Sequence, residues 1–286
     1  MNSARYPSLE DMPVLVTGGA TGIGANIVRA FHEQGARVAF IDVQDQPSNA
    51  LTSELPGAVH RHSDVTDIPA LQDAIADFAR EVGTIRVLVN NVANDKREAV
   101  EDVTVADWDV AQAINLRPQF FAAQAVRPGM AAAGGGAIIN FSSVAWRLGH
   151  GDMTPYTTAK AAVLGLTNAL ADAFGNDNIR VNAIEPGAVM TERQRELWFK
   201  TQKEVDAVVA RQLIKRVLCG EDIARMVLFL ASDEAQMITK QSFAVNGGLV
   251  CSENQKGTGR WLWISWTRIP VEKPSLVSRR LPGSFL

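Results

Sequence analysis

Two cysteines in 286 residues, Cys219 and Cys251, are too few for a disulfide framework and favour a reducing compartment. The chain has no long basic run and a net charge of −3, so its composition gives no support for nucleic-acid binding. Charged residues precede the short apolar run 14–16, so no signal peptide or membrane span can be drawn at the N-terminus. We therefore expect a soluble cytoplasmic protein.

Short apolar runs alternate with amphipathic segments through most of the chain. Seven runs are predicted as strands: 13–17, 37–41, 59–62, 87–90, 137–142, 180–184 and 242–245. Helices are predicted at about 22–34, 69–82, 104–131, 155–175, 192–213 and 221–232. This pattern is typical of one α/β domain, residues 1–250, built as a Rossmann-type, doubly wound sheet of seven parallel strands with helices on both faces. The segment at about 188–213 breaks the alternation and is predicted to be a lid over the carboxyl edge of the sheet.

The last 36 residues, 251–286, have a different composition. They carry six basic and two acidic side chains, so this segment is +4 and the remainder is −7. Trp261, Trp263 and Trp266 lie in it without a heptad or a convincing amphipathic period. We interpret the segment as an extension that packs on the surface or across a subunit interface, with a partner-binding or membrane-surface arm as the alternative.

Tyr156 and Lys160 are four residues apart and therefore share one face of a predicted helix. A nearby ammonium favours phenolate, so Lys160 would lower the pKa of Tyr156 and make it a general base. Bringing that pKa from about 10 to about 7 needs roughly 4 kcal/mol, more than a lysine alone supplies in water, and a bound cationic nicotinamide could add the rest. The same pair by itself also fits an ordinary solvated helix pair.

A glycine-rich loop, Thr17-Gly18-Gly19-Ala20-Thr21-Gly22-Ile23-Gly24, joins the first strand to the next helix. Its glycines would let a diphosphate approach the helix N-terminus. Asp42 ends the second strand, where its carboxylate would bind an adenosine ribose and repel a 2′-phosphate, so we expect NAD and not NADP. Asp64 and Val65 could hold the adenine edge and Asn91 could line the ribose, although ordinary turn chemistry explains these residues equally well.

These residues together resemble the short-chain dehydrogenase/reductase family over about 13–250. The resemblance rests on motifs in the family's order and spacing: the glycine loop, Asp64, Asn90-Asn91, Asn115, Ser143, Tyr156-x-x-x-Lys160 and Pro186-Gly187. It implies that Ser143 and Tyr156 bind the reacting oxygen, that Lys160 contacts the nicotinamide ribose, and that Asn115 holds a water in a proton relay. Ser142 is the rival for the serine role. The resemblance further implies that Gly187, Val189 and Thr191 hold the carboxamide, and it implies a homotetramer. We expect no metal site.

A narrower resemblance concerns the substrate. The segments Asn90-Asn91-Val92-Ala93-Asn94-Asp95, 115–118 and 191–198 are similar to NAD-dependent aldose (D-xylose-like) 1-dehydrogenases, which oxidise carbon 1 of a cyclic pentose or deoxyhexose to a lactone. Where the family commonly has Asn-Asn-Ala-Gly, this chain has Val92 and Ala93, a change that either reshapes the pocket floor or is a tolerated turn variant. Candidates for sugar contacts are Asn94, Ser143, Trp146, His150 and Trp198, and Glu192 and Arg193 are further candidates.

Two other functions stay open at this point. One is a carbonyl reductase or secondary-alcohol dehydrogenase acting on a 3-oxoacyl thioester or a steroid. Asp42 disfavours an NADPH-driven reductase, and the charged segment 192–196 disfavours a steroid. The other is a non-catalytic nucleotide-binding scaffold, which predicts loss of the catalytic set, whereas Asn115, Ser143, Tyr156 and Lys160 are all present.

Overall fold

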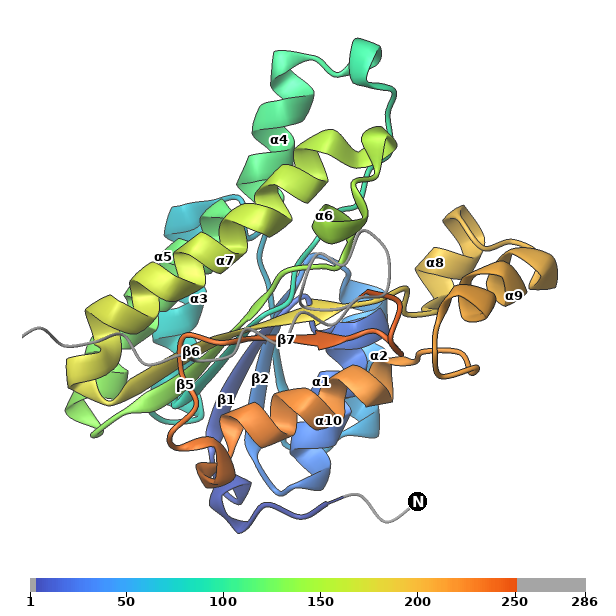
Figure 1. Ribbon diagram of the computed structural model, residues 1–286. Helices are drawn as coiled ribbons and strands as arrows, with labels where there is room; N and C mark the ends of the chain where they lie inside the picture. Colours follow the sequence, from blue (N-terminus) through green and yellow to red (C-terminus); the bar gives the residue numbers. More distant parts are fainter. Residues whose placement is uncertain (1–3, 251–286) are drawn as a thin grey trace, which may run out of the picture. The chain divides into compact units, whose positions relative to one another are not determined.

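A seven-stranded parallel sheet organises residues 4–250, the part of the chain that this computed structural model describes. These residues belong to a unit that spans Met1–Ser252. The strands run in the order β3-β2-β1-β4-β5-β6-β7 (Figure 1). Their bounds are β1 Pro13–Thr17, β2 Arg37–Asp42, β3 Val59–His62, β4 Val87–Asn90, β5 Gly136–Phe141, β6 Ile179–Pro186 and β7 Ser242–Val245. The predicted fold class is confirmed, and the strand bounds differ from the expected ones by at most two residues.

Successive side chains of each central strand enter opposite apolar layers. In β1, Val14 and Val16 pack on one face of the sheet and Leu15 packs on the other. All three are fully buried. A strand that alternates between two covered faces reads as a continuous apolar run, which is why the sequence pattern revealed these strands.

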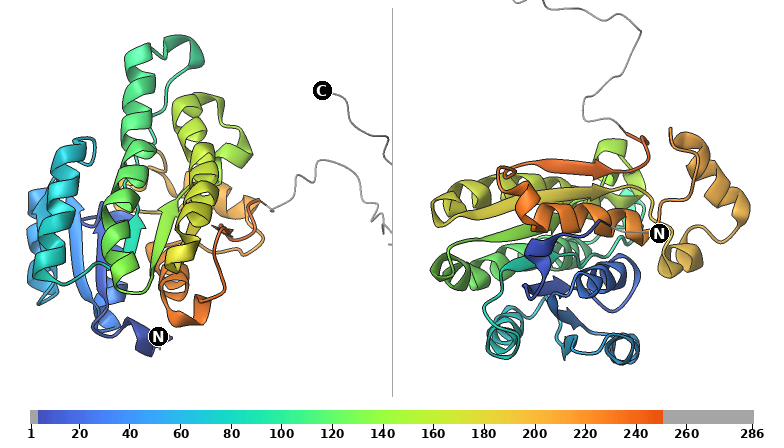
Figure 2. Two further views of the ribbon diagram at one scale, coloured as in Figure 1. Left: turned by 90° about the vertical axis from the view of Figure 1, so that its left-hand side faces the viewer. Right: turned by 90° about the horizontal axis from the view of Figure 1, so that it is seen from below.

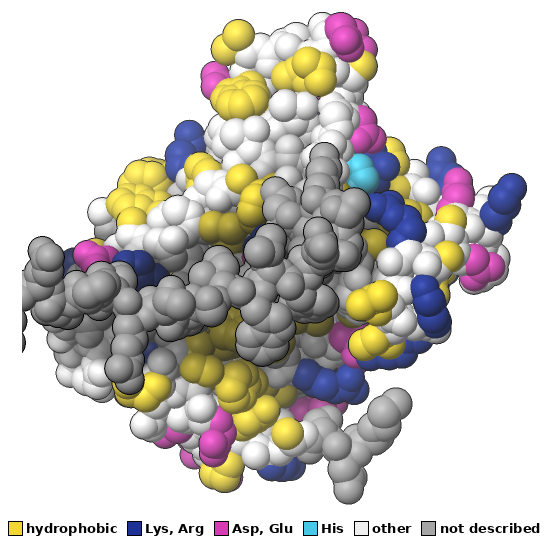
Figure 3. All heavy atoms as spheres, in the orientation of Figure 1, with side chains coloured by type: hydrophobic (Ala, Val, Ile, Leu, Met, Phe, Trp, Pro, Cys, Tyr) yellow, Lys and Arg dark blue, Asp and Glu magenta, His cyan; other side chains and the backbone are white. Residues whose placement is uncertain are grey.

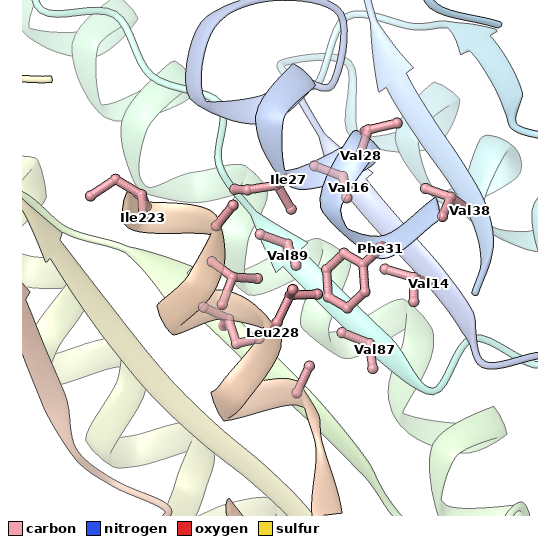
Figure 4. Close-up of a cluster of buried hydrophobic side chains, with 14 of the residues drawn as sticks. Val14, Val16, Ile27, Val28, Phe31, Val38, Val87, Val89, Ile223 and Leu228 are labelled. Carbon is pink, nitrogen blue, oxygen red and sulfur yellow. The ribbon is translucent and has the colours of Figure 1, made fainter. Parts of the chain in front are cut away.

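Helices cover both faces of the sheet (Figures 1 and 2). The first layer comprises α1 (Gly22–Glu33), α2 (Asp45–Glu54) and α10 (Gly220–Ala231). Figure 4 shows its core, where Phe31 of α1 and Leu228 of α10 meet the valines of β1 and β4. The second layer comprises α3 (Ile68–Glu81), α5 (Arg117–Ala132) and α7 (Thr154–Phe174), with α4 (Val105–Asn115) packed on α5 and α7. Burial on both faces fixes the sheet as a rigid platform.

Two helical predictions were wrong in detail, and one helix, α2, was not predicted. The expected helix 104–131 is two helices, because Leu116 leaves helical geometry just before Pro118, a residue that cannot donate to the preceding turn. The expected helix 192–213 is α8 (Glu192–Leu197) and α9 (Gln202–Arg211), and Thr201 starts α9 with a capping box. The sequence also gave no sign of α2, in which only Ser48 and Leu51 are buried.

Short elements complete the part of the chain with described coordinates: the helix α6 (Ala145–Leu148) and the 3-10 turns η1 Pro7–Leu9, η2 Val100–Asp102, η3 Gly151–Met153, η4 Gly175–Asp177 and η5 Asp233–Ala235. Within residues 4–250, no helix has the length and apolarity that crossing a membrane requires. The interpretation of 251–286, including its tryptophans, concerns residues outside the described part of the chain.

The topology brings the carboxyl ends of all seven strands to one edge. After β1 the chain moves outward to β2 and β3, and β4 starts the other half on the opposite side of β1. This reversal creates a crevice between β1 and β4 in which ligands of doubly wound sheets bind. The segment α8–α9 follows β6 at this edge and stands away from the helical layers (Figure 1).

Candidate active site

A cavity of about 1570 Å³ opens at the carboxyl edge of the sheet. Single-ligand pockets usually measure roughly 300 to 1,000 Å³, so this one has room for a large cofactor and a small substrate together. Every residue expected to bind the cofactor lines it: Gly18, Thr21, Gly22, Ile23, Gly24, Asp42, Asp64, Val65, Asn91, Tyr156, Lys160, Gly187, Val189 and Thr191. The fold therefore gathers residues from both halves of the sheet at one place.

The glycine loop needs glycine at two positions for different reasons. Gly22 has a φ of +57°, in the left-handed region that other residues rarely adopt. A Cβ at Gly24 would lie 1.8 Å from the carbonyl oxygen of Gly18. The Asn91 side chain donates to the carbonyl oxygens of Thr17 at 3.1 Å and Gly18 at 2.9 Å. The loop is thus held with the N-terminus of α1 facing the cavity, where a helix favours an anion.

Asp42 and Ser63 lie at the ends of β2 and β3 on the far side of this loop. The Asp42 carboxylate accepts hydrogen bonds from the backbone of Ala20 at 2.9 Å and Gln44 at 3.0 Å, and the residue is 7% exposed. The Ser63 hydroxyl lines the cavity, is buried and has no partner. An unpaired buried hydroxyl is costly, so it indicates a polar ligand group. Sequence reasoning missed Ser63 because serine after a strand is common.

Ser143 and Tyr156 meet across the cavity from β5 and α7. Both side chains line the cavity, and the Ser143 hydroxyl is near enough to act on the pKa of Tyr156. The Ser143 oxygen accepts from the backbone of Ala145 at 3.1 Å. Ser142, the rival serine, instead donates to the carbonyl oxygen of Lys160 at 2.7 Å. The geometry therefore favours Ser143 as the serine that works with Tyr156.

The expected lowering of the Tyr156 pKa by Lys160 is absent from the protein without ligands. Burial raises the pKa of Tyr156 to about 12, although the Ser143 hydroxyl acts in the opposite direction. The Lys160 nitrogen lies 5.7 Å from the centre of the Tyr156 ring and donates to the carbonyl oxygen of Phe141 at 2.8 Å. Burial also lowers the pKa of Lys160 to about 7. Enclosure penalises both charges, and the sequence spacing could not reveal this cost.

Asn115 is fully buried behind the cavity and does not line it. Its side-chain oxygen accepts from the backbone nitrogen of Asn94 at 2.9 Å. Its side-chain nitrogen donates to the carbonyl oxygens of Asn94 at 3.1 Å and Ala111 at 2.9 Å. Asn115 thus fixes the loop after β4 to the end of α4.

The candidate sugar contacts separate into two groups. Asn94, Ser143 and His150 line the cavity, as do Glu192 and Arg193. Figure 3 shows Lys and Arg side chains next to a His side chain between the region of α6 and the segment α8–α9. The part of the cavity beside the segment α8–α9 therefore combines charged and polar side chains with apolar ones such as Phe199 and Val208.

Trp146 and Trp198, the two tryptophan candidates for sugar contacts, do not line the cavity. Trp146 turns to β6 and donates from its indole nitrogen to Glu185 at 2.9 Å. Trp198 lies under the guanidinium of Arg97, which is 4.2 Å from the ring. Each indole pairs with a charged neighbour, an outcome that depends on residues far away in sequence.

The loop after β4 holds a carboxylate to which the sequence reading gave no role. Asp95 is 9% exposed, lines the cavity, and accepts hydrogen bonds from Arg193 and from Gln194 of α8. Burial opposes its ionisation, but these hydrogen bonds outweigh burial and hold the pKa of Asp95 below its usual value. Ala93 does not have a positive φ, so this turn accommodates it without backbone strain.

Comparisons with known proteins agree with this geometry. The family model described as "Enoyl-(Acyl carrier protein) reductase" matches residues 18–250. The chain belongs to the short-chain dehydrogenase/reductase family. It is an oxidoreductase, and the fold of this family binds a nicotinamide dinucleotide.

Two relatives of this short-chain dehydrogenase are each 44% identical to it over 252 residues. One is named "Probable galactose dehydrogenase GalD", from Rhizobium meliloti (strain 1021), and the match covers 86% of this chain and 98% of the relative. The other is D-xylose 1-dehydrogenase from Caulobacter vibrioides (strain NA1000 / CB15N), and the match covers 87% of this chain and 99% of the relative. A solved structure of a short-chain dehydrogenase/reductase double variant from Serratia marcescens has a TM-score of 0.78 and 32% identity, and covers 85% of this chain and 99% of that one.

The residues present fit a nicotinamide dinucleotide along the whole cavity. The glycine loop has no side chain at Gly24, where a Cβ would collide with the backbone. The Ser63 hydroxyl at the end of β3 is unpaired, and Tyr156 and Lys160 line the cavity at the end of β5. Thr191 lies close to the loop, since a Cβ on Gly22 would be 3.3 Å from its methyl group. The short-chain dehydrogenase can therefore hold the adenosine at β2 and β3 and the nicotinamide between β5 and β6.

Proposed function

We propose that this short-chain dehydrogenase is an NAD-dependent aldose 1-dehydrogenase, which oxidises carbon 1 of a cyclic pentose or deoxyhexose to a lactone. One observation carries the proposal: Ser143, Tyr156 and Lys160 converge on a cavity that hydrogen-bonding side chains, among them Asn94 and His150, also line. Relatives named as galactose and D-xylose dehydrogenases support a sugar as the substrate.

NAD is favoured over NADP by Asp42. Its buried carboxylate points to the backbone of the glycine loop, where it would accept hydrogen bonds from ribose hydroxyls and repel a 2′-phosphate. The residues that line the cavity next to it, Ile41, Val43 and Gln44, offer no positive charge to a phosphate.

The reaction needs a base for the anomeric hydroxyl and an acceptor for the hydride. The Tyr156 oxygen would take the hydroxyl proton while the C1–H electron pair leaves carbon 1, so that the C1–O single bond becomes the lactone carbonyl. Ser143 donates to the same oxygen and keeps it within reach of Tyr156. When bound, oxidised NAD accepts the hydride and supplies a positive charge that favours phenolate.

Lys160 contributes through its position near Tyr156. A lysine with a pKa of about 7 is partly charged at neutral pH, and its nitrogen is held by the Phe141 carbonyl oxygen on the cavity side of α7. We propose that it binds ribose hydroxyls and adds to the stabilisation of phenolate. We propose that Asn115 serves the water of the proton relay through Asn94, which it holds by two hydrogen bonds and which lines the cavity.

Asn94 and His150 are the proposed sugar-binding residues. Both line the cavity with Ser143 and offer hydrogen-bonding groups to hydroxyls. Trp146 and Trp198 have no place in this proposal, because neither lines the cavity.

A 3-oxoacyl or steroid substrate is the second candidate within the same chemistry. The charged residues of the lid disfavour it, since Glu192, Arg193 and Glu196 of α8 and Arg211 of α9 line the cavity. A non-catalytic scaffold is disfavoured because Ser143, Tyr156 and Lys160 are all present and line one cavity.

We also propose a cytoplasmic homotetramer. Exposed apolar side chains on α4 and α5, among them Val105, Val110 and Phe120, support self-association. Light scattering of the purified full chain would measure the assembly.

NADH formation at 340 nm, with NAD or NADP and a panel of free aldoses, tests the function. We expect NAD-dependent turnover with one pentose or deoxyhexose, and lactone as the product by mass spectrometry. Turnover with 3-oxoacyl thioesters or hydroxysteroids alone would transfer the assignment to the second candidate, and turnover with no substrate despite NAD binding would favour the scaffold.

A further inference from the structure

The loop after β4 and the helix α8 are joined by a compact set of polar contacts. One oxygen of the Asp95 carboxylate accepts from the Arg193 guanidinium, and the other accepts from the Gln194 side chain at 2.7 Å. A second nitrogen of Arg193 donates to the side-chain oxygen of Asn94 at 3.4 Å. The Arg97 guanidinium stacks on Trp198 at the end of α8. The lid is therefore tied to one particular loop.

The burial of Asp95 gives these contacts their importance. Its side chain is 12% exposed, whereas the Arg193 side chain is 49% exposed. An enclosed carboxylate is stable only while it is paired. Arg193 and Gln194 come from the lid, so Asp95 is satisfied when α8 is in the position seen here and loses both partners when α8 moves away.

The same loop contacts the proton-relay asparagine. The backbone of Asn94, the residue before Asp95, bonds both ends of the Asn115 side chain. Asp95 and Arg193 also act on Tyr156 through space. Burial has the largest effect on the pKa of Tyr156, and beyond it Asp95 raises the pKa while Arg193 lowers it. When Arg193 pairs with Asp95, its positive charge therefore offsets the negative charge of Asp95, which opposes ionisation of Tyr156.

We propose that Asp95 and Arg193 form a latch that positions the proton-transfer groups for the oxidation only when α8 covers the cavity. Both are positioning residues, since they act through Asn94, Asn115 and Tyr156. This inference rests on the proposed function for its kinetic consequence, whereas the structural link between α8 and the loop holds for any substrate.

Four variants test the latch: Arg193→Gln, Arg193→Lys, Asp95→Asn and the double variant Asp95→Asn/Arg193→Gln. The matched control is Arg195→Gln, because Arg195 is an exposed arginine of the same helix that does not line the cavity. The first readout is the exchange of backbone amides 192–199 with deuterated solvent in the full chain without any substrate. The second is kcat and KM for the aldose that the panel identifies.

We expect Arg193→Gln to speed amide exchange in 192–199 and to lower kcat by at least about tenfold while the KM for NAD changes little. Arg193→Lys should recover most of the loss. The double variant should be no worse than the poorer single variant, because two partners of one contact are not additive. Arg195→Gln should resemble the unchanged protein in both readouts.

Three results would overturn the latch: unchanged exchange in Arg193→Gln, equal losses in Arg193→Gln and Arg195→Gln, or losses that multiply in the double variant. If the unchanged protein oxidises no aldose, the proposed function fails, but amide exchange still decides whether Arg193 holds α8. The two failures are therefore distinguishable.

Discussion

Replacing Glu185 with Gln is expected to lower the free energy of unfolding by about 3 kcal/mol. The Glu185 side chain on β6 is fully buried. Its carboxylate accepts from Arg147 at 2.7 and 2.8 Å, from Trp146 at 2.9 Å and from Ser242 at 2.5 Å. Gln would place an amide donor against these donors and remove the charge that balances Arg147, whose side chain is only 20% exposed.

Urea unfolding at pH 7 followed by circular dichroism measures this loss. With a denaturant dependence of about 3 kcal/mol per M, the midpoint should fall by about 1 M. The control is Glu54→Gln, since Glu54 makes a similar two-bond contact with Arg29, at 2.7 Å each, but on the surface. Exposed pairs contribute about 0 to 1 kcal/mol, so the control midpoint should move little.

The penalty should also depend on pH. Burial opposes the ionisation of Glu185, but the hydrogen bonds from Arg147 and Ser242 outweigh it and hold its pKa below the ordinary value. A lowered carboxyl pKa stabilises the fold above the unfolded pKa of about 4.3, and that stabilisation is lost as pH falls through the folded pKa. The difference between Glu185→Gln and the unchanged protein should therefore shrink below about pH 4. Equal midpoints for Glu185→Gln and the unchanged protein at pH 7 would refute the reasoning.

Tyr156→Phe should leave NAD binding nearly intact and lower turnover by several powers of ten, and turnover close to that of the unchanged protein would sink the assignment of the base. Asp42→Ala should weaken NAD binding and lower the ratio of kcat/KM with NAD to kcat/KM with NADP by at least about tenfold. An unchanged ratio would contradict the role of Asp42 in binding the ribose. In a Tyr6→Phe background Tyr156 is the only tyrosine of the chain. Absorbance at 295 nm should then show that the raised pKa of about 12 keeps Tyr156 neutral up to pH 10 and that saturating NAD moves its ionisation to lower pH, since a positive charge favours phenolate.

The sequence predicted the strands, and the residues that it assigned to the cofactor line one cavity, because both features depend on local patterns. Buried strands such as β1 are apolar on both faces, and a loop around Gly22 and Gly24 admits few alternatives to glycine. The spacing of the glycines and the position of Asp42 at the end of β2 were enough to predict that they lie together, and they line one cavity. Periodicity was a weaker guide where a helix buries little, as in α2.

The substrate side could not be predicted to the same depth, because it depends on contacts between segments far apart in sequence. Trp198 and Arg97, about one hundred positions apart, pair with each other and leave the indole outside the cavity. The pKa of Tyr156 has the same origin. Its spacing from Lys160 was read correctly, but the degree of enclosure, which raises that pKa, is a property of the assembled cavity.

We propose that the turn after β4 links recognition of the substrate to closure of the lid. Asn94 lines the cavity, and its side-chain oxygen accepts a hydrogen bond from Arg193. Its backbone nitrogen donates to the side-chain oxygen of Asn115. A change at this turn therefore alters the wall that faces the substrate and the anchor of α8 together. A substitution at His150, which lines the cavity and lies outside the latch, should alter sugar preference alone. If Asn94→Ala and His150→Ala both shift the preference between aldoses, but only Asn94→Ala speeds amide exchange in 192–199, recognition and closure share this turn. Equal exchange in the two variants would separate the two roles.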